Sequence, residues 1–117
     1  MHRCVFSMQA SLAIIREGEL FLGQNQIRLL RQVLTDGSIH AAAMNLRMSY
    51  QHAWHLLDKL NRLSPIPVLV RKKGGRDGGG CSISPYGIKL IEMYAKKESE
   101  LLIFLEQSSS DFDGCFF

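Results

Sequence analysis

Two short helical segments separated by a tight turn restrict the fold of this chain more than any other feature. Ser38 and Ser49 each stand at an N-cap position, where a serine hydroxyl accepts a hydrogen bond from a free backbone N–H of the first helical turn. Helically spaced apolar residues follow the two serines: Ile39, Ala42, Ala43 and Leu46, then Tyr50, Ala53, Trp54, Leu57 and Leu60. The pattern predicts helices over about 38–46 and 49–63. Small side chains at 41–43 permit the close crossing that is typical of a helix-turn-helix.

Strand and helix signals on both sides of this pair complete the order of elements. Two short apolar runs around Glu17-Gly18 predict a β-hairpin over 11–22. A basic, glycine-rich loop at 72–80 lies between two strand-like runs, which predicts a wing over 68–84. The other predicted elements are a helix over about 24–35, a long helix over 85–107 after Ser84-Pro85, and a disordered tail over 108–117. The predicted fold class is mainly α with small β: a winged helix-turn-helix domain over 1–107, with an N-terminal β-hairpin and a long C-terminal helix.

Positive charge is concentrated in the middle of the chain. The net charge is +3 over 117 residues, but the segment 47–77 holds seven basic and two acidic side chains. A basic segment on a mildly acidic remainder is typical of a protein that binds a polyanion. The charge distribution therefore favours a nucleic-acid partner.

Composition argues against several other classes of protein. The longest apolar run, Leu101–Leu105, is far shorter than the roughly 20 residues that cross a bilayer, and the N-terminal segment is a poor fit to a signal peptide. Three scattered cysteines argue against a disulfide framework or a zinc ribbon. We therefore expect a cytoplasmic protein with reduced thiols, no cofactor and no metal.

The ordered motifs resemble a known family. Residues 37–63 read GSIHAAAMNLRMSYQHAWHLLDKLNRL, and residues 74–87 read GGRDGGGCSISPYG. Over roughly 11–105 the chain is similar to the N-terminal DNA-binding domain of the ModE family of molybdate-responsive regulators, a winged helix related to the LysR type. The motifs that carry the resemblance are Gly37-Ser38-Ile39, Ala42-Ala43, Ser49-Tyr50, Ala53-Trp54, the wing glycines 74–75 and 78–80, and Pro85-Tyr86-Gly87.

The resemblance implies a transcriptional regulator that binds double-stranded DNA. Family members that bind molybdate carry C-terminal oxyanion-binding domains, and this chain ends where those domains begin. We therefore expect no molybdate binding by these residues.

The third predicted helix and the wing supply the candidate DNA contacts. Gln51, His52 and His55 lie away from the apolar stripe and are expected to read base edges, because glutamine pairs with adenine and a neutral histidine can donate or accept. The residues expected at the DNA backbone are Arg47, Ser49, Tyr50, Lys59, Arg62, Lys72, Lys73 and Arg76. Tyr50 fits a core position equally well, and Trp54 is expected in the core, where a large aromatic side chain anchors a helix.

Other interpretations of these residues have less support. His52 and His55 with Cys81 lack the fourth ligand and the spacing of a zinc site. The glycine-rich loop lacks the G-K-[ST] ending of a phosphate cradle, and no spacing indicates a catalytic triad, so we do not expect an enzyme. The main alternative is a winged helix used as a protein–protein adaptor, which would not need a basic wing.

The last predicted helix indicates a homodimer. Ile88, Ile91, Ala95, Leu102 and Leu105 follow heptad-like spacing, and Leu101, Ile103 and Phe104 extend the apolar surface around the end of the helix. A helix that is apolar all round must be covered. A second subunit, contacted through Ile91, Leu102 and Leu105, is the expected cover, and packing against the N-terminal hairpin is the alternative.

Overall fold

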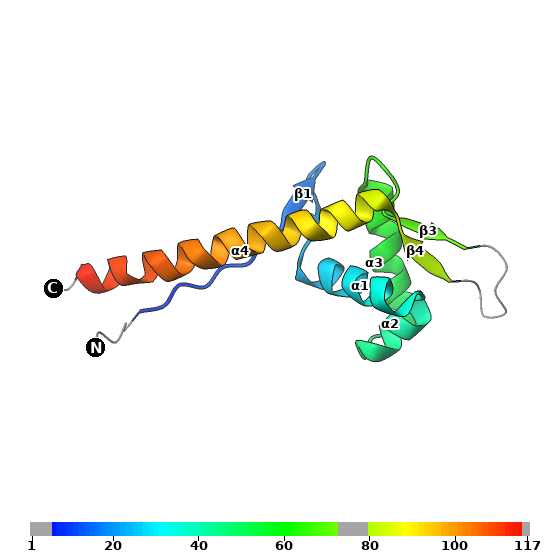
Figure 1. Ribbon diagram of the computed structural model, residues 1–117, viewed down its shortest axis with the longest axis horizontal. Coiled ribbons are helices and arrows are strands. Elements are labelled where there is room, and N and C mark those ends of the chain that lie inside the picture. Colours follow the sequence, from blue (N-terminus) through cyan, green and yellow to red (C-terminus); the bar gives the residue numbers. More distant parts are fainter. Residues whose placement is uncertain (1–5, 73–79, 116–117) are drawn as a thin grey trace.

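The computed structural model describes residues 6–72 and 80–115, and its elements follow the predicted winged helix-turn-helix order (Figure 1). The elements are β1 Ile14–Arg16, β2 Glu19–Leu22, α1 Gln24–Asp36, α2 Ile39–Asn45, α3 Tyr50–Leu63, β3 Leu69–Arg71, β4 Cys81–Ile83 and α4 Pro85–Gly114. β1 pairs with β2, and β3 with β4, as two separate antiparallel sheets. The predicted fold class is confirmed.

A tight turn connects the two strands of the N-terminal hairpin. Glu17 and Gly18 both have positive φ, 51° and 77°, between Arg16 and its partner Glu19. Two successive positive φ values define the type I′ turn, whose twist matches that of paired strands. The X-Gly pair therefore produces the hairpin, although its strands are shorter than the predicted 11–22.

The core lies where α1, α2 and α3 meet the two hairpins. Leu29 and Leu30 of α1 are fully buried, as are Ala42 of α2 and Ala53 of α3. Because two of these side chains are single methyl groups, α2 and α3 pack closely against the rest of the core. The alanines of the helix pair thus have the role that the sequence indicated.

α4 is longer than the sequence predicted. It runs unbroken to Gly114, so the prediction of a helix that ends at 107 with a disordered tail from 108 is wrong for the described residues. The N-terminal segment lies beside this part of α4 (Figure 1): the Met8 N–H donates to Ser109 Oγ at 3.2 Å, and the rings of Phe6 and Phe112 are 6.3 Å apart. The Ser109 hydroxyl also donates to the Leu105 carbonyl one turn earlier, within the helix.

The outer half of α4 projects from the body of the protein. Glu98 bonds Gln24 and Arg31 of α1, and beyond it α4 extends away, so that the molecule measures 65 × 29 × 22 Å. We call residues 99–114 the α4 arm. Residues 6–9 lie toward its tip, and β3 and β4 lie at the opposite end of the molecule (Figure 1). No helix within residues 6–72 and 80–115 is long and apolar enough to cross a membrane.

Two of the three predicted dimer residues are covered within one chain. Ile91 packs against the core, and Leu105 is buried, whereas Leu102 is 58% exposed. The core covers part of the Ile91 side chain, so of these three residues Leu102 offers the most surface to a second subunit. The dimer contact itself stays a prediction.

Candidate nucleic-acid interface

The turn between α2 and α3 is held by backbone hydrogen bonds. The Arg47 N–H donates to the Met44 carbonyl at 3.2 Å, and the Met48 N–H donates to the Ala43 carbonyl at 3.0 Å. These two bonds form a Schellman motif, which requires a left-handed residue at the position that Arg47 occupies with φ 56°. Glycine favours this conformation, so an arginine there costs stability and presents an exposed cation beside the start of α3.

The start of α3 is fixed by a cap and an aromatic stack. Ser49 Oγ accepts the His52 N–H at 3.1 Å, which is the predicted N-cap. The Tyr50 ring stacks on His40 of α2, with centroids 4.2 Å apart and planes within 12°. Tyr50 is 42% exposed, so the core interpretation of this residue is wrong. Ser49 and Tyr50 instead lie at the exposed junction of the two helices.

The predicted base-reading residues lie on the solvent face of α3. Gln51, His52 and His55 are all exposed, while Ala53 and Leu57 face the core. Gln51 and His55 are one helical turn apart and therefore share a face, with His52 on its flank. Arg62, also exposed, follows His55 two turns later on the same face. The helix thus presents an exposed polar strip along its length, and an α-helix fits the major groove of DNA.

Trp54 lies outside the core, and the prediction that it is buried is wrong. Its indole is half-buried at the edge of α3, where the Arg71 guanidinium lies over the ring, 5.3 Å from its centroid. The rings of Trp54 and His55 lie nearly perpendicular to each other, with their centroids 5.4 Å apart. The apolar stripe on α3 includes Trp54 by spacing alone, and only the position of β3 reveals that a cation covers it.

Arg71 is a candidate residue that the sequence prediction left out of the site. In β3 successive side chains point to opposite faces, so Arg71 shares the face of buried Leu69, toward α3, while Val70 is 50% exposed on the other face. The available signal was the position of Arg71 two residues after Leu69 in a predicted strand, which puts both side chains on one face.

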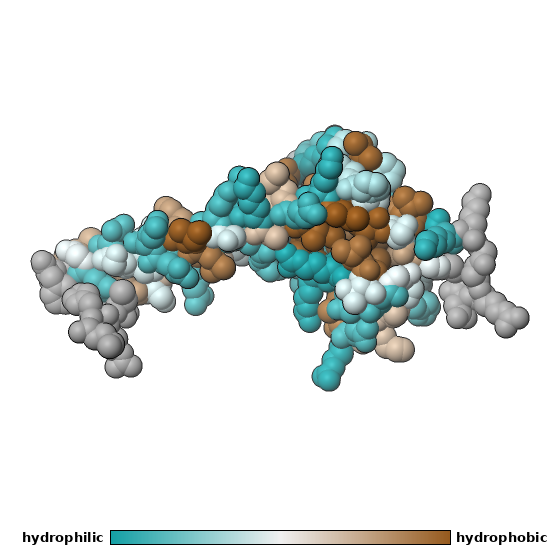
Figure 2. All heavy atoms as spheres, viewed as in Figure 1, coloured by the Kyte–Doolittle hydropathy of each residue, from teal (hydrophilic) through white to brown (hydrophobic). Residues whose placement is uncertain are grey.

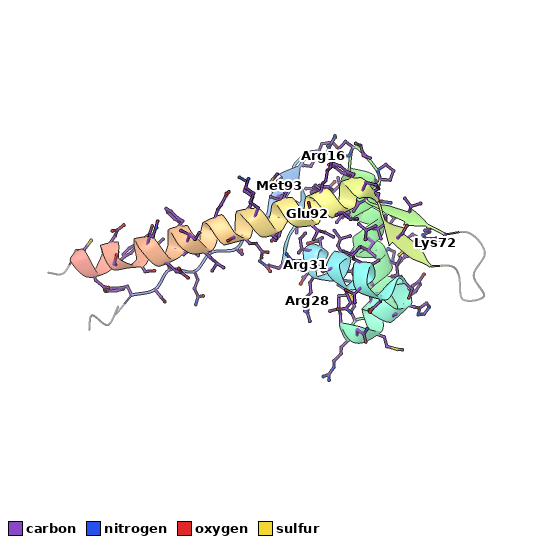
Figure 3. The ribbon with its side chains drawn as sticks, in the orientation of Figure 1. Arg16, Arg28, Arg31, Lys72, Glu92 and Met93 are labelled. Atoms are coloured by element: carbon purple, nitrogen blue, oxygen red, sulfur yellow. The ribbon has the colours of Figure 1, made fainter. Side chains whose placement is uncertain are left out.

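The other predicted backbone contacts differ in their surroundings. Lys59 forms an ion pair with Glu19 of the hairpin, 3.6 Å between Nζ and Oε1, so part of its charge is already neutralised. Lys72 is exposed where β3 ends, at the wing end of the molecule (Figure 3). Lys73 and Arg76 lie outside the described residues.

Asn61 joins α3 to the wing. Its Oδ1 accepts the N–H groups of Val68 at 2.8 Å and Leu69 at 3.1 Å, and its Nδ2 donates to the Leu69 carbonyl at 3.1 Å. The amide side chain therefore bonds β3 much as a neighbouring strand would. The wing is also tied to the end of α1, because the Cys81 N–H donates to the Gly37 carbonyl at 3.2 Å.

The cysteine at the base of the wing is an ordinary buried thiol. Burial raises the pKa of Cys81, although the nearby Arg71 and Lys72 act in the opposite direction. A raised pKa disfavours the thiolate that binds metals or attacks electrophiles. Among the residues that the structure describes, no group of three histidine, cysteine, aspartate or glutamate side chains is arranged to hold a metal ion.

Sequence comparison relates the chain to bacterial regulators. It is 39% identical over 83 residues to the transcriptional regulator ModE of Haemophilus influenzae, covering 71% of this chain and 32% of that protein. It is 33% identical over 106 residues to the DNA-binding transcriptional dual regulator ModE of Escherichia coli K12, covering 89% and 38%. The molybdenum-pterin-binding protein MopB of Rhodobacter capsulatus is 37% identical over 90 residues, covering 74% and 33%. The chain spans about a third of the length of these relatives.

Structural comparison agrees with the fold. The crystal structure of the S. aureus MepR–DNA complex contains a chain that superposes with a TM-score of 0.54 and 19% identity, covering 81% of this chain and 76% of that one. At this identity the match shows a shared fold and nothing more. No family model matches the chain. The 33–39% identity to two regulators named ModE and to the molybdenum-pterin-binding protein MopB shows that this chain resembles the N-terminal part of the ModE family's members.

Proposed function

We propose that this chain binds double-stranded DNA in a sequence-specific manner and acts in transcription regulation. The observation that carries the proposal is the exposed polar face of α3, set between the Arg47 turn and the base of the wing. An α-helix fits the major groove, and in a helix-turn-helix the second helix of the pair enters it. The names of the ModE relatives, which are transcriptional regulators, support the same function.

Within this proposal the exposed residues divide into two roles. Gln51, His52 and His55 read base edges, because they lie on the central exposed face of α3. Arg47, Ser49, Tyr50, Arg62 and Lys72 contact the DNA backbone from the two ends of α3 and from the wing, joined by Lys73 and Arg76 from the sequence prediction. Lys59 contributes less, because its ion pair with Glu19 must open first.

We also propose that the protein is a homodimer through the α4 arm. Leu102, Ile103 and Phe104 are 58%, 52% and 56% exposed on consecutive positions of the arm. Figure 2 shows a hydrophobic group on the arm that is separate from the hydrophobic surface of the body. Consecutive helix positions point about 100° apart, so these side chains spread apolar surface around the arm. Exposed apolar surface favours association, and a two-fold dimer would match a DNA site with two half-sites.

The test is a mobility-shift titration combined with selection of preferred sequences from random duplexes. Gln51→Ala and His55→Ala should each cost about 1–3 kcal/mol on the selected site and relax its sequence at one or two positions, with non-specific binding unchanged. Arg28→Ala, an exposed arginine of α1, is the control. A wild-type chain that binds no duplex at low salt would favour the adaptor alternative and refute the proposal.

A further inference from the structure

The contact between Trp54 and Arg71 links the recognition helix to the wing. Trp54 belongs to α3 and Arg71 ends β3, and with Asp58, Asn61, Leu69 and Cys81 they line one small cavity at the junction of the two elements. The guanidinium carbon is 5.3 Å from the centre of the indole, within the range of a cation–π contact. The Asn61 bonds to Val68 and Leu69 hold β3 in the register that brings the two side chains together.

The charge of Arg71 is not neutralised by this contact. Arg71 is exposed, and the ion pairs formed within residues 6–72 and 80–115 do not include it, although Asp58 lines the same cavity. An indole occupies the flat face of a guanidinium and leaves the N–H donors at its rim available. By contrast, Arg31 and Lys59 are paired with Glu98 and Glu19.

We propose that Arg71 contacts a DNA phosphate where α3 meets the wing, and that Trp54 is the residue that positions it. The inference rests on the proposed DNA binding and adds a contact outside the predicted set. A guanidinium that is already ordered against the indole loses less side-chain entropy when it binds a phosphate. The Trp54 indole therefore strengthens the phosphate contact of Arg71 without itself touching DNA. Its planar fork of donors suits a phosphate better than a lysine ammonium does.

The first experiment measures binding to a random-sequence duplex over a series of salt concentrations. Arg71→Ala should weaken binding about tenfold and lower the slope of log K against log salt by about 0.9, the value for one lost phosphate contact. Arg71→Lys should keep the slope and lose part of the affinity. Lys96→Ala, which removes an exposed cation from α4, is the matched control and should change neither quantity. An Arg71→Ala variant with the wild-type slope would overturn the proposal.

The second experiment tests the positioning role. Trp54→Leu should weaken binding about threefold to fivefold in the wild-type background, with the salt slope unchanged, and should have no further effect in the Arg71→Ala background. Trp54→Phe, which retains an aromatic face, should bind the duplex with an affinity between those of the wild type and Trp54→Leu. Circular dichroism checks that each variant is folded. In the free protein, the emission of Trp54, the only tryptophan, should change when Arg71 becomes alanine.

The possible failures are distinguishable. Equal losses from Trp54→Leu and Trp54→Phe in both backgrounds, or an unchanged Trp54 emission in Arg71→Ala, would show that the tryptophan has only a structural role and would overturn the inference while leaving DNA binding intact. A wild-type chain that binds no duplex would refute the proposed function and this inference together.

Discussion

Replacing Asn61 tests whether one side chain holds the wing against the recognition helix. Asn61→Ala removes three hydrogen bonds to Val68 and Leu69 and leaves their two N–H groups without an acceptor. Both residues are buried, with 0% and 7% exposure, so water does not readily replace the amide. An unsatisfied buried donor costs about 1–3 kcal/mol, which gives an expected loss of about 2–5 kcal/mol in the free energy of unfolding.

A second variant separates the acceptor from the donor. Asn61→Asp keeps an oxygen for both N–H groups but places a carboxylate oxygen where the donor to the Leu69 carbonyl was. The lost hydrogen bond and the repulsion between the two oxygens give an expected loss of about 1–3 kcal/mol, below that of Asn61→Ala. Asn45→Ala is the surface control, because that amide donates to Asp36 in an exposed bond, and it should stay within about 0.5 kcal/mol of wild type.

The assay is urea unfolding followed by far-UV circular dichroism and by Trp54 fluorescence. The reasoning predicts the stability order wild type, Asn61→Asp, Asn61→Ala, with coincident transitions from the two probes. If Asn61→Ala lies within 1 kcal/mol of wild type, or Asn61→Asp is as unstable as Asn61→Ala, then β3 does not depend on this amide and the reasoning is refuted.

Four further predictions follow from single features of the structure. Arg47→Gly should raise the free energy of unfolding by about 1 kcal/mol, because φ 56° no longer strains the chain, and should weaken duplex binding; a loss of stability in urea unfolding contradicts this. Gly87→Ala should lower the melting temperature at a cost of about 1–3 kcal/mol, because the new Cβ would lie 2.7 Å from the Val68 carbonyl oxygen, whereas Gly114→Ala, with open space around it, should be harmless. Leu102→Glu should yield monomers in sedimentation at micromolar concentration with unchanged circular dichroism, and a wild-type monomer would remove the basis of the proposed dimer. Molybdate should leave the melting temperature and duplex affinity unchanged in calorimetry with sulfate as control, because Arg47, Arg71 and Lys72 are exposed and an oxyanion site needs converging, shielded donors; stoichiometric binding of molybdate alone would contradict this.

The sequence by itself determined the features that depend on neighbouring residues. The caps at Ser38, Ser49 and Ser84 each accept an N–H three residues later, as a capping serine should. The Glu17-Gly18 turn likewise follows from its two residues. Caps, turns and periodicity act over three or four positions, so their pattern is visible in the chain. The polar face of α3, with Gln51 and His55, follows from the same periodicity.

Only the tertiary structure decided which of these surfaces are covered. Met8 and Ser109, 101 positions apart, join the N-terminal segment to α4 beyond the predicted end of that helix. Glu19, 40 residues away in sequence, forms an ion pair with Lys59 and partly neutralises its charge. Arg71 covers Trp54 and leaves that indole at the surface. Each of these contacts joins elements that are distant in sequence, and their energies depend on how the core orients those elements, which local spacing does not encode.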